Sequence, residues 1–156
     1  MSHKLIGICV ESDNKEQAAK EADEILVNQL QADHFGFFDW AIRSDSVNSR
    51  FNDIPAILKT TDELAQTKIQ EMFEWTKDEY QYHLFQLQEI LKTSPNTFED
   101  GTFRYNAHCL GTKAENYLFD CDGEAVDNTK AYERVKSGTC YDNKKTMFVV
   151  FYDAHS

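Results

Sequence analysis

A periodic stripe of apolar side chains between residues 60 and 92 is the feature that most constrains this fold. The segment reads TTDELAQTKIQEMFEWTKDEYQYHLFQLQEILK, and its apolar residues recur at steps of three and four, as on one face of an α-helix. At about 1.5 Å of rise per residue the helix would be roughly 45 Å long, more than a domain of this size normally spans. We therefore expect a helix over 61–92, either continuous or broken near Thr76-Lys77-Asp78. Its stripe consists of Ala65, Ile69, Met72, Phe73, Thr76, Tyr80, Leu84, Leu87 and Leu91.

Short runs rich in β-branched and aromatic residues flank this helix and predict strands. Two of them, 4–12 and 35–43, are separated by an amphipathic segment that begins with Asp13 and Glu16, a pair spaced as in a capping box. The chain is therefore expected to start with a β-α-β unit. Residues 44–59 contain early turn signals and predict an excursion with at most one helical turn. Three further strands are predicted after the long helix, over 103–110, 115–126 and 146–155.

This order of elements predicts an α+β fold, a single domain over 1–156. We expect a mixed or mainly antiparallel sheet of about five strands, packed on two or three helices. A chain of 156 residues is long enough to bury roughly 70% of the surface that its unfolded form exposes. One sizeable core is the consequence.

The charge of the chain bears on its partners. It carries 27 acidic and 16 basic side chains, a formal net charge of −11, and its one adjacent basic pair is Lys144-Lys145. Such a surface repels phosphate, so direct binding to nucleic acid is not expected, whereas a basic protein partner is favoured.

Compartment and cofactors follow from what the sequence lacks. No apolar run approaches the ~18 residues of a membrane span, and no signal peptide is recognised at the start. The four cysteines show no C-x-x-C pair, so we expect reduced thiols and a cytoplasmic protein. No cofactor-binding motif or nucleophile motif occurs, so no cofactor is expected and an enzyme is disfavoured.

The stretch YLFDCDGEAVDN, residues 117–128, holds four carboxylates around one glycine. A calcium loop that started at Asp120 would need glycine at its sixth position and glutamate at its twelfth, where Ala125 and Ala131 stand. The pair Asp122-Gly123 is instead typical of a two-residue type I′ turn. The segment therefore predicts a hairpin.

Aromatic and acidic side chains alternate along the long helix beside its apolar stripe. They could form a secondary core beneath the sheet and the 44–59 segment, because 13% of the chain is aromatic. They could instead form a partner face, since Trp and Tyr within a charged rim resemble an interface anchor. Carboxylates along a rigid helix could also imitate phosphates to a basic groove. This predicted partner face consists of Glu71, Trp75, Asp78, Glu79, Tyr82, Phe85 and Glu89.

A second candidate site lies at the C-terminal end of the last predicted strand. Asp153 and His155 stand two residues apart and would point to the same face, where Asp39 could join them as ligands of a divalent metal. A polar chain end without function is the alternative. His108 and Cys109 are adjacent, so on a strand they would point to opposite faces and would not pair.

Two short stretches resemble proteins of a known kind. Phe38-Asp39-Trp40 after the first β-α unit, and Phe148-Val149-Val150 leading into Asp153-x-His155, are similar to small uncharacterised proteins of bacteriophage genomes. The resemblance implies no catalytic activity. It implies expression in a bacterial cytoplasm, where small acidic phage proteins often bind and inhibit host or defence machinery.

Three functions are open at this point. The leading expectation is a non-enzymatic protein-binding module that acts as a phage-type inhibitor, a mimic of nucleic acid that occupies a basic surface. The alternatives are a small metal-dependent hydrolase or nucleotide-processing enzyme that uses Asp39, Asp153 and His155, and a homo-oligomeric structural protein whose aromatic helical face meets its symmetry mate.

Overall fold

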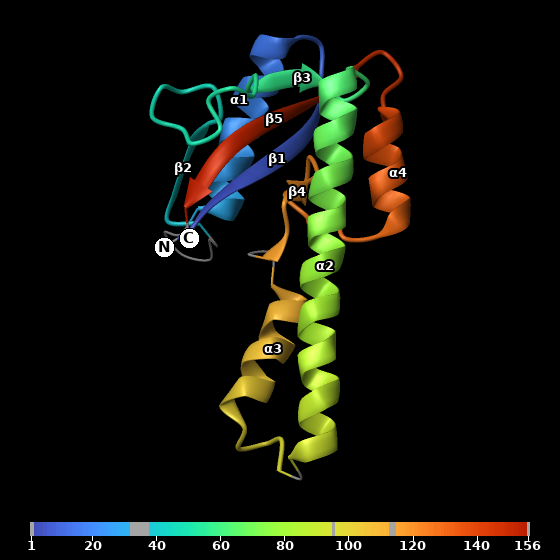
Figure 1. Cartoon of the computed structure of the whole chain (residues 1–156). Coiled ribbons are helices and arrows are strands. Elements are labelled where there is room, and N and C mark those ends of the chain that lie inside the picture. The colour runs from blue at the N-terminus through green and yellow to red at the C-terminus, as the bar shows by residue number, and fades with distance from the viewer. Residues whose placement is uncertain (1, 32–37, 95, 113–114, 156) are drawn as a thin grey trace.

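Two long antiparallel strands form the centre of the fold. In the computed structural model, which describes residues 2–31, 38–94, 96–112 and 115–155, β1 (His3–Ser12) and β5 (Thr146–His155) pair over their full lengths (Figure 1). Nine of the ten residues of β5 are buried. This follows from its composition, because a run of β-branched and aromatic residues suits a strand that is covered on both faces.

Three short strands complete a five-stranded sheet. β2 (Trp40–Arg43) and β3 (Ile57–Lys59) both pair antiparallel with β5, and β4 (Leu118–Phe119) pairs parallel with β1. The order β2-β5-β1-β4 places β5 between the two strands of the initial β-α-β unit. The predicted α+β class with a mixed, mostly antiparallel sheet is confirmed.

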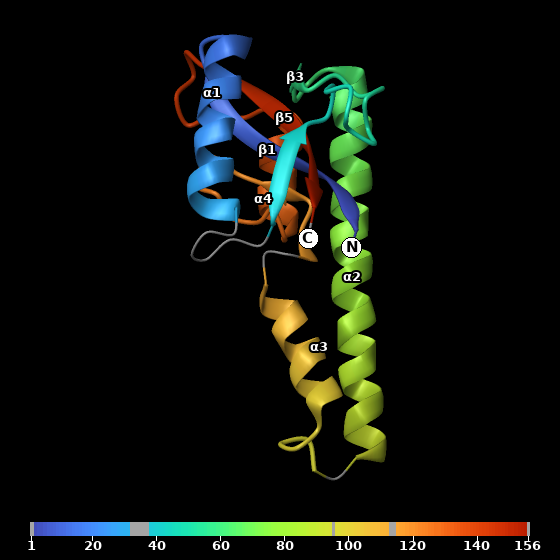
Figure 2. The same cartoon turned by 90° about the vertical axis from the view of Figure 1, so that its left-hand side faces the viewer.

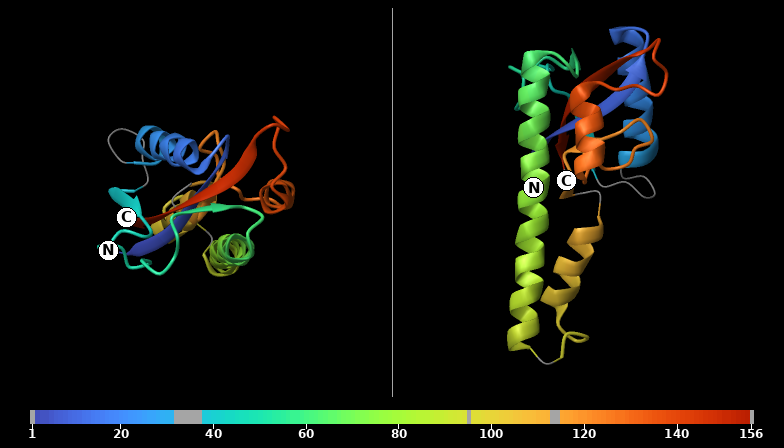
Figure 3. Two further views of the ribbon diagram at one scale, coloured as in Figure 1. Left: turned by 90° about the horizontal axis from the view of Figure 1, so that it is seen from above. Right: turned by 90° about the vertical axis from the view of Figure 1, so that its right-hand side faces the viewer.

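Helices cover both faces of this sheet. On one face lies α1 (Lys15–Ile25), which continues as the π-helical turn η1 (Leu26–Leu30); on the other lie α2 (Glu63–Thr93) and α4 (Thr129–Ser137) (Figures 2 and 3). Alternation along β1 and β5 supplies both cores, since successive side chains of a strand point to opposite faces. The α1 side takes Ile6, Ile8, Val10, Phe148, Val150 and Tyr152, and the α2 side takes Leu5, Cys9, Met147, Val149 and Phe151.

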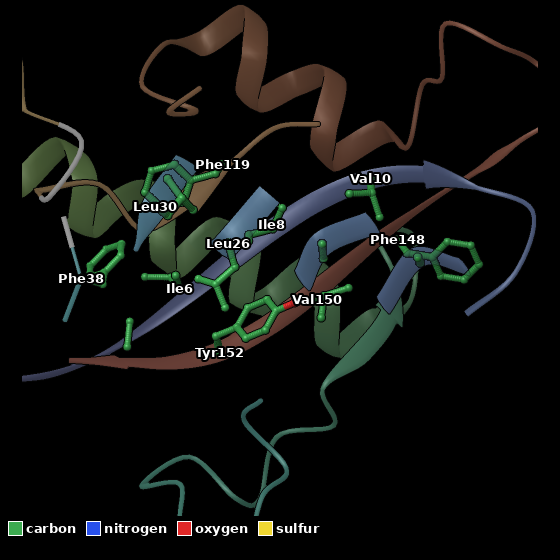
Figure 4. Close-up of a cluster of buried hydrophobic side chains, with 13 residues drawn as sticks. Ile6, Ile8, Val10, Leu26, Leu30, Phe38, Phe119, Phe148, Val150 and Tyr152 are labelled. Atoms are coloured by element: carbon green, nitrogen blue, oxygen red, sulfur yellow. The ribbon is translucent and has the colours of Figure 1, made fainter. Parts of the chain in front are cut away.

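The core on the α1 side includes one buried hydroxyl. Tyr152 packs beneath α1 (Figure 4) and donates a 2.6 Å hydrogen bond to Asp23 Oδ1, while Arg43 Nη2 donates to Asp23 Oδ2 at 2.7 Å. Burial, followed by the bond to Asp23, raises the pKa of Tyr152. One carboxylate thus ties together α1, β5 and β2.

Replacing Tyr152 by phenylalanine is expected to lower the free energy of unfolding by about 1 to 2 kcal/mol, because a hydrogen bond to a charged acceptor is lost while Asp23 keeps Arg43. Urea denaturation measures this loss. Tyr141→Phe is the matched control, since Tyr141 is exposed and its variant should keep the wild-type stability. Equal stability of Tyr152→Phe and wild type would contradict the role given to this bond.

The long helix is continuous and leaves the sheet halfway along its length. α2 has no break at 76–78, and its buried residues after Phe73 are only Thr76 and His83. Beyond the sheet it runs beside α3 (Gly101–Gly111) as a helical hairpin (Figure 1). We call α2 residues 77–93 together with α3 the helical arm.

The predicted strand over 103–110 was wrong, since these residues form α3. Asp100 caps the helix by accepting a 3.0 Å hydrogen bond from the Phe103 amide. The residues that α3 buries, Asn106 and Cys109, lie three positions apart, a helical spacing that a short mixed run hides. Helix α4 and strand β3 were not predicted either.

Three other predicted features differ from the structure in their bounds or in the residue that caps them. The N-cap of α1 is Asn14, not Asp13. The strand over 35–43 is described only as Trp40–Arg43, and 35–37 lie outside the described residues. The strand over 115–126 is reduced to the two residues of β4.

The acid-rich segment turns as predicted, but with a different turn. Phe119 bridges to Ala125, and Asp120 Oδ1 accepts hydrogen bonds from the amides of Asp122 (2.9 Å) and Glu124 (3.0 Å). Gly123 has φ 72°, whereas no described non-glycine residue has a positive φ. A type I′ turn needs positive φ at both central residues, so the turn is not of this type; the Gly123 amide donates to the Asp120 carbonyl at 3.0 Å, and Gly123 is left-handed.

Candidate functional site

The aromatic members of the predicted partner face are exposed on α2. Trp75, Tyr82 and Phe85 have exposed fractions of 37%, 58% and 55%. Neither the sheet nor the 44–59 segment therefore buries them as a secondary core. The Trp75 ring meets the ring of Tyr117 edge-on at 5.4 Å, which holds the indole in one place.

The acidic members lie around these rings with one exception. Glu71 and Asp78 line a surface hollow of about 390 Å³ beside Trp75, together with Thr67, Gln70 and Glu74. Further along the helix, Glu89 pairs with Lys92 at 3.1 Å. Ion pairs of this exposed kind contribute little stability, so such carboxylates remain available to a partner.

Glu79 is the exception, because it turns toward the interior of the arm. Its Oε1 accepts a 3.3 Å hydrogen bond from the Tyr117 hydroxyl, and its Oε2 lies 3.8 Å from His83 Nε2. Glu79 therefore belongs to a second group of residues between α2 and α3, which we call the His83 cluster: Glu79, His83, Asn106, Cys109 and Glu115.

The His83 cluster is centred on a buried imidazole. His83 is 4% exposed, and its Nδ1 lies 2.8 Å from Asn106 Oδ1. The amide nitrogen of Asn106 donates to the Thr102 carbonyl at 2.8 Å, so its oxygen faces the ring and accepts the Nδ1 proton. The other nitrogen, Nε2, then faces Glu79 and Glu115, each with an oxygen at 3.8 Å.

This arrangement leaves Nε2 without a hydrogen bond among the described residues, although it is buried. Cys109, also 4% exposed, lies beside it: His83, Cys109 and Glu115 each offer a ligand atom within 4.8 Å of the other two. A cavity of about 210 Å³ opens next to the three side chains and is bordered by Thr76 and Asp127.

Burial and negative charge set the acid–base properties around the cluster. Burial raises the pKa of the Cys109 thiol; the Tyr105 hydroxyl opposes this, while Glu115 and Glu79 raise it further. Burial and Glu79 raise the pKa of Tyr117 to about 12. Burial lowers the pKa of Lys4 to about 8 against the attraction of Glu115 and Glu79. Each of these three shifts has burial as its largest cause, and Glu79 and Glu115 contribute to all three.

The second predicted site is only partly assembled. Asp153 and His155 lie on β5, and His155 Nδ1 is 3.5 Å from Asp39 Oδ2. Asp153, however, is engaged elsewhere: its Oδ1 lies 2.9 Å from His3 Nδ1, and its Oδ2 accepts a 2.8 Å hydrogen bond from the Arg50 amide. Asp39 and His155 thus lie close together, but Asp153 does not join them, so the three side chains do not converge on one metal position.

Sequence reasoning missed the His83 cluster. His83 and Cys109 are separated by 26 positions, and they meet only because 101–111 is a helix folded back on α2. One signal was available: His83 lies seven residues after Thr76, two helical turns along the buried side of α2.

Comparisons with protein-family models, with curated proteins and with solved structures found no match. Among the described residues, no helix combines the length and the apolar character needed to cross a membrane. The chain is thus an α+β domain that extends a helical arm, with an exposed aromatic and acidic face on α2 and the His83 cluster between α2, α3 and the segment after α3.

Proposed function

We propose that this chain is a non-enzymatic protein-binding module that uses the exposed side of α2 to occupy a basic surface of a protein partner. The observation that carries the proposal is the hollow beside Trp75, where Glu71, Glu74 and Asp78 surround an exposed indole. In sequence, Tyr82 and Phe85 continue this face toward the tip of the arm.

The chemistry of the hollow suits an arginine or lysine side chain. The indole attracts a cation over its ring, a contact worth about 0.5 to 2 kcal/mol according to desolvation. Carboxylates at the rim accept its N–H groups, and charge-assisted hydrogen bonds are the stronger kind. The indole and the carboxylates around it would thus both bind a basic side chain.

The charge of the surrounding segment favours the same partner. Residues 71–112 hold seven carboxylates and three Lys or Arg side chains, within a chain of net charge −11. This field would speed encounter with a basic surface and repel an acidic one. The resemblance to bacteriophage proteins suggests a host or defence protein of the bacterial cytoplasm as the partner, with the carboxylates of α2 in place of nucleic-acid phosphates.

The test uses the full chain as bait in a bacterial lysate, followed by titration calorimetry with the purified partner. Trp75→Ala and Tyr82→Ala are each expected to weaken binding about 30-fold or more, as for anchor residues of an interface. Binding should also weaken as ionic strength rises, because part of it is electrostatic.

Tyr141→Ala is the matched control, since Tyr141 is an exposed aromatic residue outside α2 and its loss should leave the affinity unchanged. Equal affinity of wild type, Trp75→Ala and Tyr82→Ala would overturn the proposal. The proposal would also be overturned if light scattering showed that the wild type is a dimer and that both variants are monomers, because the face would then bind a second copy of the chain.

A further inference from the structure

The interior of the helical arm is polar, which is unusual for a pair of packed helices. Among its described residues, the fully buried side chains are His83, Asn106 and Cys109. A helix of 11 residues, the length of α3, is marginal in water and normally depends on an apolar face for its stability. A further interaction would add to the stability of α3 against α2, because the apolar side chains of the arm are only partly buried: Leu84, Leu87, Ile90, Phe103 and Leu110.

We propose that His83, Cys109 and Glu115 bind a zinc ion, with the Glu79 carboxylate as fourth ligand, and that this ion fastens α3 and the segment after it to α2. The proposal concerns the inside of the arm and does not depend on the partner face. Its basis is the buried Nε2 of His83, which is aimed at a thiol and two carboxylates and has no hydrogen bond among the described residues.

The separations of the donor atoms suit a small ion. Zn–N and Zn–O bonds of about 2.1 Å and a Zn–S bond of about 2.3 Å place tetrahedral ligand atoms roughly 3.4 to 3.7 Å apart. The two distances from His83 Nε2 to carboxylate oxygens are 3.8 Å, and the three atoms of His83, Cys109 and Glu115 lie within 4.8 Å. For His83, Cys109 and Glu115, closure around zinc therefore requires side-chain adjustments of about 1 Å.

The donor types select zinc over magnesium and calcium. Thiolate and imidazole are ligands that zinc prefers, whereas magnesium and calcium take oxygen. Asn106 supplies the outer contact that a metal-binding histidine usually has, because its carbonyl oxygen accepts the Nδ1 proton and turns Nε2 toward the ion. A soft ligand, an oriented imidazole and one carboxylate thus lie close together, and a second carboxylate, Glu79, lies beside the imidazole.

Metal binding is measured on the full chain after treatment with a chelator, by competition with a zinc-sensitive dye and by titration with cobalt. One metal per chain is expected, with the near-ultraviolet absorption of a cobalt–thiolate bond. Cys109→Ser and Glu115→Gln should weaken zinc binding about 100-fold or more, and Asn106→Ala about 10- to 100-fold.

Two control variants each remove one histidine or one thiol that is not a proposed ligand. His108→Ala removes the exposed neighbour of Cys109, and Cys140→Ser removes a thiol outside the arm; both should bind zinc as wild type does. Circular dichroism of each variant confirms that it is folded, and Glu115→Gln serves if Cys109→Ser does not fold. Absence of zinc binding at micromolar free zinc would overturn the proposal. Equal affinity of Cys109→Ser and wild type would overturn it as well.

Discussion

Replacing Ile69 by alanine is expected to lower the free energy of unfolding by about 3 to 4 kcal/mol, the range for a large aliphatic residue deleted from a tight core. Ile69 is fully buried where α2 crosses the sheet, and it packs in the same cluster as Met72, Val149 and Phe151. Urea denaturation followed by far-ultraviolet circular dichroism measures the loss.

Leu91→Ala is the matched control on the same helix. It deletes a similar number of carbons from the same predicted stripe, but Leu91 is 62% exposed near the end of the arm. Alanine also favours helix slightly more than leucine does, so stability should change by less than about 0.5 kcal/mol. Similar losses for both variants would contradict the exposure of Leu91, because the arm would then be covered along its length.

Ile69 and Leu91 lie on the same predicted stripe but differ in burial, and this difference marks what the sequence could predict about α2. Periodicity gave the helix and its apolar side, because steps of three and four depend only on helical geometry. It could not show where the sheet ends, since periodicity describes a face and not the surface that covers it. Tyr80, Leu84, Leu87 and Leu91 belong to the same stripe as Ile69, yet none of the four is fully buried.

The class of the fold was predictable, while its shorter elements were not. Long apolar runs such as β1 and β5 are distinctive, whereas FRYNAHCL supports a strand and a helix equally well by composition. Packing against α2 and the cap at Asp100 decide for a helix. α4 is only nine residues long and buries Val135 alone fully; Asn128, which caps its start, and Gly138, which ends it with φ 70°, are the signals in its sequence.

The two groups of candidate residues differ for a related reason. Trp75, Tyr82 and Phe85 belong to one helix, so local spacing was enough to group them. His83, Cys109 and Glu115 come from α2, from α3 and from the segment that follows α3, and only the tertiary fold brings them together. A prediction that made 103–110 a strand could not have found this cluster.

Adding zinc to the metal-free chain is expected to raise the free energy of unfolding by about 3 to 4 kcal/mol when free zinc exceeds the dissociation constant roughly 300- to 1,000-fold. The reason is linkage: the four donors are near one another only in the folded arm, so the ion binds the native state in preference. For a chain of this size the melting temperature should rise by about 10 °C.

The same linkage predicts where the chain loosens when zinc is removed. Amide hydrogen exchange should accelerate in α3, which has no apolar core of its own, and should stay slow in β1 and β5, whose stability comes from the two apolar cores. Cys109→Ser should behave like the metal-free wild type with or without zinc, while Cys140→Ser should gain stability as wild type does. If zinc instead slowed exchange in Cys109→Ser as it does in wild type, the ion would be stabilising the chain from a different position, because this variant lacks one of the proposed ligands.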